Sequence, residues 1–271
     1  MWKNRFHIIL LLLLPPIIWW MPAYAASGQM ADTALPNGYV LRQSVALDPK
    51  QNGLQGFMQI LEDARITPQM RKAMWGVAGR APDMVLSKEE LQGLGTTPLN
   101  AHLRLVGISG QVISDDVLEV PLAAIKTAFL YGTAFPTYLV TADYSIGMGS
   151  YAGPLTMLAE VRDGHLQYIQ AVENENSGKD RIGLARTLKT EWRIVAARHG
   201  PGKEIEEIAC RPNFDKPVSD NEEFSPDDFW IIYSTYRFDG TRWHVATRRV
   251  AGFWENEGPN SWPAQNLFPQ E

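Results

Sequence analysis

The stretch YRFDGTRWHV, residues 236–245, carries the clearest turn signal in the chain. It places Asp239 and Gly240 between two segments in which apolar and polar residues alternate. An Asp-Gly pair in that context is typical of a two-residue β-hairpin turn, where glycine adopts positive φ without steric cost. The segment EVRDGHLQYI, residues 160–169, repeats the arrangement around Asp163 and Gly164. The sequence therefore predicts two hairpins of an antiparallel sheet.

A two-residue turn at Asp239 and Gly240 fixes which residues lie opposite each other in the second hairpin. One face then carries apolar side chains and should meet the core. On the other face Arg237 lies opposite Arg242, and Thr235 lies opposite His244. We expect that face to hold three arginines and one histidine: Arg237, Arg242, His244 and Arg248.

Two interpretations of this cationic face remain open. Acidic side chains from the segment SDNEEFSPDD, residues 219–228, could neutralise it within the chain. Alternatively, the face binds an anionic ligand or an acidic partner surface, because the guanidinium fork matches carboxylate and phosphate groups. The acidic side chains concerned are Asp220, Glu222, Glu223, Asp227 and Asp228.

Two tryptophans near the C-terminus are candidates for an exposed binding platform. Trp254 and Trp262 lie in the segment FWENEGPNSWPAQNLFPQE, residues 253–271, which has the composition of a loop. Tryptophan is enriched at recognition surfaces. We therefore add both residues to the candidate binding site.

The first half of the mature chain carries helix signals. Leu54, Phe57, Met58 and Leu61 have the spacing of one apolar helical face. Thr67 followed by Pro68 predicts an N-cap and a helix through Met74. Further helices are expected after Ser87, which forms a capping-box pattern with Glu90, and over residues 121–130. A single strand is expected over residues 39–47.

These signals predict an α+β protein. Residues 26–135 form a helix-rich N-terminal part, and residues 136–271 form a mainly antiparallel sheet, sandwich-like or open and twisted. The two parts are expected to pack as one globular unit.

The first 25 residues have the pattern of a cleaved signal peptide. Lys3 and Arg5 precede an apolar run over residues 8–18, and Ala23-Tyr24-Ala25 suits signal peptidase. The run is shorter than the roughly 20 residues of a spanning helix, and prolines interrupt it. We expect a periplasmic or secreted protein without a stable membrane anchor.

The charge of the mature chain argues against nucleic-acid binding. Removing Lys3 and Arg5 lowers the basic count from 25 to 23 against 30 acidic residues, a net charge of about -7. A nucleic-acid-binding protein needs a strongly basic face. The partners that we expect are an anionic small ligand or another envelope protein.

Catalytic signals are weak. The mature chain has four histidines, His102, His165, His199 and His244, and no pair has the spacing of a zinc motif. We expect neither a metal site nor a cofactor. The single cysteine, Cys210, cannot form an internal disulfide and is expected to be buried.

The segment DYSIG, residues 143–147, partly matches a nucleophile elbow around Ser145. His244 or His165 could act as the base, with Asp143 or Asp163 as the orienting group. The leading hypothesis is thus a non-catalytic binding or inhibitory protein. The alternatives are an envelope serine hydrolase that uses Ser145 and an envelope scaffold or assembly protein that uses Trp254 and Trp262.

Overall fold

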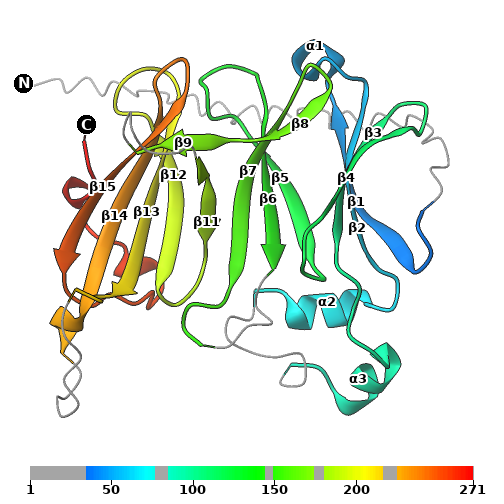
Figure 1. Ribbon diagram of the computed structural model, residues 1–271, viewed down its shortest axis with the longest axis horizontal. Helices are drawn as coiled ribbons and strands as arrows, with labels where there is room; N and C mark the ends of the chain where they lie inside the picture. The colour runs from blue at the N-terminus through cyan, green and yellow to red at the C-terminus, as the bar shows by residue number, and fades with distance from the viewer. Residues whose placement is uncertain (1–34, 77–84, 144–148, 174–179, 216–224, 271) are drawn as a thin grey trace, which may run out of the picture.

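The computed structural model describes residues 35–76, 85–143, 149–173, 180–215 and 225–270. Within these residues the chain is mostly β-structure, arranged in three sheets with three short α-helices. Figure 1 shows the sheets following one another along the long axis, with α2 and α3 at one end of the strands. Among the described strands, every pair is antiparallel except that of β9 (Gln170–Val172) with β15 (Trp243–Ala251). The expected helix-rich N-terminal half is wrong, because among the described residues of 35–135 strands outweigh helices, with five strands and only three short helices.

The first sheet has the strand order β1-β2-β3-β4. β1 (Tyr39–Leu47) confirms the strand expected over residues 39–47. The helix expected around Leu54 to Leu61 is wrong, because Gly56–Asp63 forms a strand that pairs on both sides and is buried along nearly its whole length. Because this strand is covered on both faces, apolar side chains occur on each face, and Leu54, Phe57, Met58 and Leu61 also fit a helical spacing. The strands are β1 (Tyr39–Leu47), β2 (Gly56–Asp63), β3 (His102–Gly107) and β4 (Val112–Val117).

The middle sheet has the order β11-β7-β6-β5, and β8 pairs with β7. The helix expected over residues 121–130 is wrong, because Ala123–Ala128 pairs with β6 along its whole length. The alanine and leucine residues of the segment 121–130 favour a helix locally, but pairing with β6 overrides that preference. The strands are β5 (Ala123–Ala128), β6 (Thr137–Asp143), β7 (Pro154–Arg162), β8 (His165–Tyr168) and β11 (Gly183–Ala185).

The hairpin of β7 and β8 confirms the first predicted turn. Arg162 lies opposite His165, which leaves Asp163 and Gly164 as the two turn residues. Their φ angles are 51° and 78°. Both residues therefore occupy the left-handed region that this turn requires.

The third sheet has the order β10-β9-β15-β14-β13-β12. Its longest strands are β13 and β14, and β14 and β15 form the second predicted hairpin. The strands are β9 (Gln170–Val172), β10 (Asp180–Arg181), β12 (Thr190–Ala196), β13 (Lys203–Pro212), β14 (Phe229–Phe238) and β15 (Trp243–Ala251).

The register of the second hairpin differs from the prediction. Phe238 lies opposite Trp243, so the turn is centred on Gly240 and Thr241, one residue later than expected. Asp239 does not occupy the turn centre. Its side chain instead accepts hydrogen bonds from the N–H groups of Thr241 at 2.7 Å and Arg242 at 2.9 Å. Moving the centre by one residue shifts the pairing by two, so every side chain keeps its predicted face.

The helices are short, and two begin where the sequence predicts. Thr67 caps α2 by accepting the N–H of Met70, and Ser87 forms the capping box of α3 with Glu90. The helices are α1 (Pro49–Asn52), α2 (Pro68–Met74) and α3 (Lys88–Leu94), with 3₁₀ turns at η2 (Pro226–Asp228), η3 (Pro259–Ser261) and η4 (Gln265–Leu267).

The middle sheet is buried on both faces. Tyr138 and Val140 on β6 pack with the first sheet, whereas Leu139 between them packs with the third sheet. Cys210 is buried, as expected. In the described part of the chain, no helix has the length and apolar character needed to cross a membrane.

Candidate functional site

The predicted cationic hairpin face forms one wall of a small cavity. Arg237 lies opposite His244, and Arg248 lies further along the same face, while Arg242 belongs to the turn. The cavity, called here the hairpin cavity, has a volume of about 380 Å³. Its charged lining residues are Arg237, His244, Glu173 and Asp239.

Asp239 adds a carboxylate to this face. Its Oδ2 lies 2.6 Å from Nε2 of His244. Hydrogen bonds from the N–H groups of Arg242 and Thr241, followed by the contact with His244, lower the pKa of Asp239 to about 2. Asp220, Glu222 and Glu223, which were expected to compensate the arginines, lie outside the described residues.

The C-terminal segment covers another part of the face. The carbonyl of Pro269 accepts hydrogen bonds from Oγ1 of Thr235 at 3.1 Å and from Nη1 of Arg198 at 2.9 Å. Nη1 of Arg237 donates to the carbonyl of Gln270 at 3.4 Å. Phe268 is buried beside Tyr233. Much of the hairpin face therefore binds the chain's own C-terminal segment.

Trp254 and Trp262 help to hold that segment. Both are half-buried. Nε1 of Trp254 donates to the carbonyl of Ser261 at 3.0 Å, and Trp262 stacks on Phe268 with ring centroids 5.4 Å apart. The guanidinium of Arg193 covers the Trp262 ring at 4.4 Å. The structure places the two tryptophans in a packed cluster and not on an open platform.

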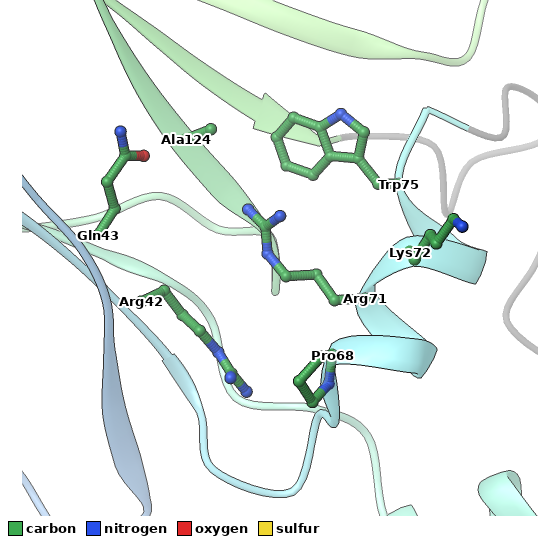
Figure 2. A pocket seen from close by; sticks show the side chains of 7 residues that line it. All are labelled: Arg42, Gln43, Pro68, Arg71, Lys72, Trp75 and Ala124. Carbon is green, nitrogen blue, oxygen red and sulfur yellow. The ribbon is translucent and has the colours of Figure 1, made fainter.

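A second cavity lies where β1, α2 and β5 meet, and we call it the Arg71 cavity (Figure 2). Its volume is about 540 Å³, within the range of small-molecule sites. Figure 2 shows the Arg71 guanidinium extending into its centre, the Trp75 ring beside it and Lys72 pointing away. The lining residues are Arg42, Gln43, Pro68, Arg71, Lys72, Trp75 and Ala124.

Arg42 reaches this cavity through a β-bulge. The pairing of β1 with β2 shifts between Leu41 and Gln43, so Arg42 is the extra residue without a partner across the ladder. A bulge bends the strand and redirects the extra side chain. Nε of Arg42 lies 3.2 Å from Oε2 of Glu62, and Nη2 donates to the carbonyl of Ile66.

Two arginines share one buried carboxylate at the wall of the Arg71 cavity. Nε of Arg71 donates to both carboxylate oxygens of Glu62 at 3.0 Å, and Arg42 lies on the same group. The Glu62 side chain is fully buried, whereas those of Arg42 and Arg71 are 20% and 29% exposed. One carboxylate cannot neutralise two guanidinium groups, so this wall of the cavity is positively charged.

Arg71 is held rigidly and still has donors to offer. Its Nη2 donates to the carbonyl of Ala123 at 2.7 Å, and the Trp75 ring centroid lies 4.7 Å from its guanidinium carbon. Among the described residues, Nη1 has no hydrogen-bond partner. Arg71 therefore combines a fixed position with an unused polar edge.

The residues proposed for hydrolysis are only partly placed. Ser145 lies outside the described residues. His244 contacts Asp239 and not Asp143 or Asp163, which were the expected orienting groups. Oδ2 of Asp143 accepts the N–H of Gly76 at 2.7 Å. Within the described residues, no group of three or more His, Cys, Asp and Glu side chains is placed to hold a metal ion.

The sequence prediction missed the Arg71 cavity. Arg71 and Trp75 are four residues apart around the correctly predicted helix, so their proximity was readable. The sequence did not show that Arg42 and Glu62 lie beside them. Arg42 lies at a bulge, and Glu62 lies on a strand that was predicted to be helical.

Comparison with known proteins adds no assignment. The chain matches no family model, no curated protein and no solved structure.

Proposed function

We propose that this protein is a non-catalytic binding protein that takes an anionic group in the Arg71 cavity. The observation that carries the proposal is the pair of arginines on a single buried carboxylate, Glu62, at the wall of a cavity of about 540 Å³. The excess positive charge of Arg42 and Arg71 attracts an anion.

The arrangement of Arg71 favours binding over a purely structural role. Its Nε and Nη2 atoms tie α2 to β2 and β5, and that is structural. The remaining edge faces a cavity with an aromatic wall. A guanidinium that is already fixed loses little conformational entropy when it binds a carboxylate, sulfonate or phosphate.

The Arg71 cavity supports anion binding better than the hairpin cavity does. The hairpin cavity contains the acidic residues Glu173 and Asp239, and Asp239 contacts His244. The C-terminal segment also takes hydrogen bonds from Arg237 and Arg198. The acidic residues lower the positive potential that an anion would meet there.

Export to the periplasm or outside the cell remains part of the proposal. The pattern of residues 1–25 supports it. The ligand would then be a small anion of that compartment or an acidic group on an envelope protein. Both present the same chemistry to Arg42 and Arg71.

The proposal is tested by an NMR titration of the purified protein with benzenesulfonate at low ionic strength. The expected result is shifts of the Trp75 indole and Arg71 Nε–H signals in the wild type. We expect Arg71→Gln to raise the dissociation constant about 10- to 100-fold, as for other hydrogen bonds to charged groups worth about 1.5–3 kcal/mol. Arg42→Gln should weaken binding in the same direction.

Two controls separate this site from its rivals. The double variant Arg237→Gln, Arg248→Gln removes equivalent charges from the hairpin face and should bind benzenesulfonate like the wild type. The variant Glu62→Gln, Arg71→Gln removes the carboxylate together with Arg71, so Arg42 keeps the net charge of the wall and the variant tests whether the donors of Arg71 are needed. Binding lost in the hairpin variant and kept in the Arg71 variants would contradict the proposal.

A further inference from the structure

A third cavity, called here the Trp192 cavity, lies beside the Arg71 cavity. Its volume is about 560 Å³. It is lined by β5, β6 and β7 of the middle sheet and by β12, the edge strand of the third sheet, with the residues that follow α2 as a further wall. The lining residues that matter for its chemistry are Trp75, Lys126, Leu139, Thr141, Trp192 and Ile194.

The strand register shows that the two cavities adjoin. Ala124 lines the Arg71 cavity, and its cross-strand partner Thr141 lines the Trp192 cavity. Side chains of such a pair lie about 4.5–5.5 Å apart. Lys126 also follows Ala124 on the same face of β5. Trp75 lines both cavities.

The Trp192 cavity is apolar on its inner side. Leu139, Trp192 and Ile194 belong to the core cluster between the middle and third sheets. The Thr141 hydroxyl is hydrogen-bonded to that of Thr156 at 2.8 Å, so it adds little unsatisfied polarity. The cavity is thus the open end of a hydrophobic layer.

The arginines around the Trp192 cavity are already paired with carboxylates. Nε of Arg186 donates to Glu191 at 2.6 Å, and its guanidinium lies on the Trp192 ring at 4.6 Å. The Arg193 guanidinium binds Glu206 and covers Trp262. These two arginines offer little to a second charged group of a ligand, and the remaining cationic lining residue, Lys126, is exposed to solvent, whereas a flat apolar group can contact Trp75, Leu139 and Ile194.

We propose that the Arg71 cavity and the Trp192 cavity form one site for an amphipathic anion. The acidic group of the ligand binds Arg42 and Arg71, and a flat apolar body passes Trp75 and enters the Trp192 cavity. This inference rests on the proposed function and specifies the class of its ligand.

The test compares three probes on the purified protein. Benzenesulfonate fills only the first cavity, 1-anilinonaphthalene-8-sulfonate has the length for both, and N-phenyl-1-naphthylamine has the same apolar body without the anion. We expect the long sulfonate to bind at least tenfold more tightly than benzenesulfonate and than the neutral amine. Fluorescence reports the two naphthalene probes, and NMR reports benzenesulfonate.

Substitutions at Ile194 and at Arg71 test the two ends of the site separately. Ile194→Asn removes apolar wall from the Trp192 cavity without changing charge, and it should weaken the long sulfonate about tenfold while leaving benzenesulfonate within twofold. Ile194→Thr is the milder change if the asparagine variant does not fold. Arg71→Gln should weaken both sulfonates and leave the neutral amine unchanged.

The outcomes distinguish this inference from the function on which it rests. The inference is overturned if the long sulfonate binds no more tightly than benzenesulfonate, if Ile194→Asn leaves it unaffected, or if the neutral amine binds equally well. The proposed function survives these results provided that the binding of benzenesulfonate still depends on Arg71. Benzenesulfonate binding that is absent or independent of Arg71 overturns both.

Discussion

Carboxyl groups inside this protein have two different environments. Glu62 and Glu206 each contact two arginines and stay paired. Glu207 has another environment, because it lies on the core-facing side of β13 opposite Trp192 and its Oε2 accepts the hydroxyl of Tyr236 at 3.0 Å. Burial raises the pKa of Glu207 to about 7, against the hydrogen bond from Tyr236 and the charge of Arg211, which lower it.

The first prediction concerns the pH dependence of Glu207. In the folded chain the carboxyl group of Glu207 keeps its proton up to about pH 7, whereas the carboxyl group of an ordinary glutamate loses its proton near pH 4.5. The folded state therefore binds more protons between these values, so this contribution to stability is complete below pH 4.5 and is lost as pH rises through 7. We expect Glu207→Gln to stabilise the protein relative to wild type by about 1–3 kcal/mol more at pH 8 than at pH 5.

Thermal unfolding of wild type and Glu207→Gln at both pH values measures this difference. Effects of the other titrating groups cancel in the comparison between the two proteins. A difference in Tm that is the same at pH 5 and pH 8 would show that Glu207 titrates normally.

At the scale of elements, short-range signals identify turns and caps, while pairing determines which segments become strands. Gly164 and Gly240 both lie at hairpin turns with positive φ. Asp239 then decides the register of the second hairpin, because its side chain caps the turn instead of occupying its centre. Two arginines that were expected to lie opposite each other are thereby separated.

The second prediction tests that register with engineered cysteines. Arg237→Cys with His244→Cys places the thiols on directly opposite residues, whereas Arg237→Cys with Arg242→Cys places them on a diagonal. A disulfide needs Cα atoms about 4.4–6.8 Å apart, so only the first pair should cross-link under mild oxidation. Free-thiol counting and mass spectrometry measure the outcome.

The native cysteine does not interfere with this experiment, since Cys210 is buried. Efficient cross-linking of the pair at 237 and 242, with none at 237 and 244, would support a turn centred on Asp239 and Gly240 and contradict the observed register.

At the scale of the whole molecule, side chains join the first sheet to the middle sheet. The outer edge of β5 has no further strand among the described residues. Gln43 on β1 donates to the carbonyl of Ile125 at 2.6 Å and accepts its N–H at 2.9 Å. Glu62 and Arg71 satisfy the N–H and carbonyl of Ala123. Gln43 and Arg71 thus help to hold the two sheets together and also line the Arg71 cavity.

The third prediction concerns this junction. Gln43→Met keeps the length of the side chain and leaves both backbone groups of Ile125 without their partner. We expect a loss of about 1–3 kcal/mol of folding stability, the cost of an unsatisfied buried polar group. Amide hydrogen exchange should accelerate at Ile125, because its N–H loses the Gln43 acceptor.

Gln167→Met on β8 is the matched control. Gln167 is exposed, so the same substitution there should change stability by less than about 0.5 kcal/mol. Equal effects of the two substitutions, or unchanged exchange at Ile125, would contradict the role given to Gln43.

The sequence by itself determined the features that depend on neighbours a few residues away. These are the strand Tyr39–Leu47, the caps at Thr67 and Ser87, the Asp163-Gly164 turn and the faces of the second hairpin. Each follows from local backbone geometry or from the alternation of side chains along a strand. The signal peptide at residues 1–25 stays a prediction from the same kind of signal.

Only the tertiary structure decided the rest. β2 and β5 are strands because other strands pair with them, although their sequences also suit helices. The Arg71 cavity brings together Arg42, Glu62 and Arg71, and Gln43 bonds a residue 82 positions away. The physical reason is that burial and hydrogen bonding between distant segments outweigh local propensities, which amount to less than about 1 kcal/mol per residue.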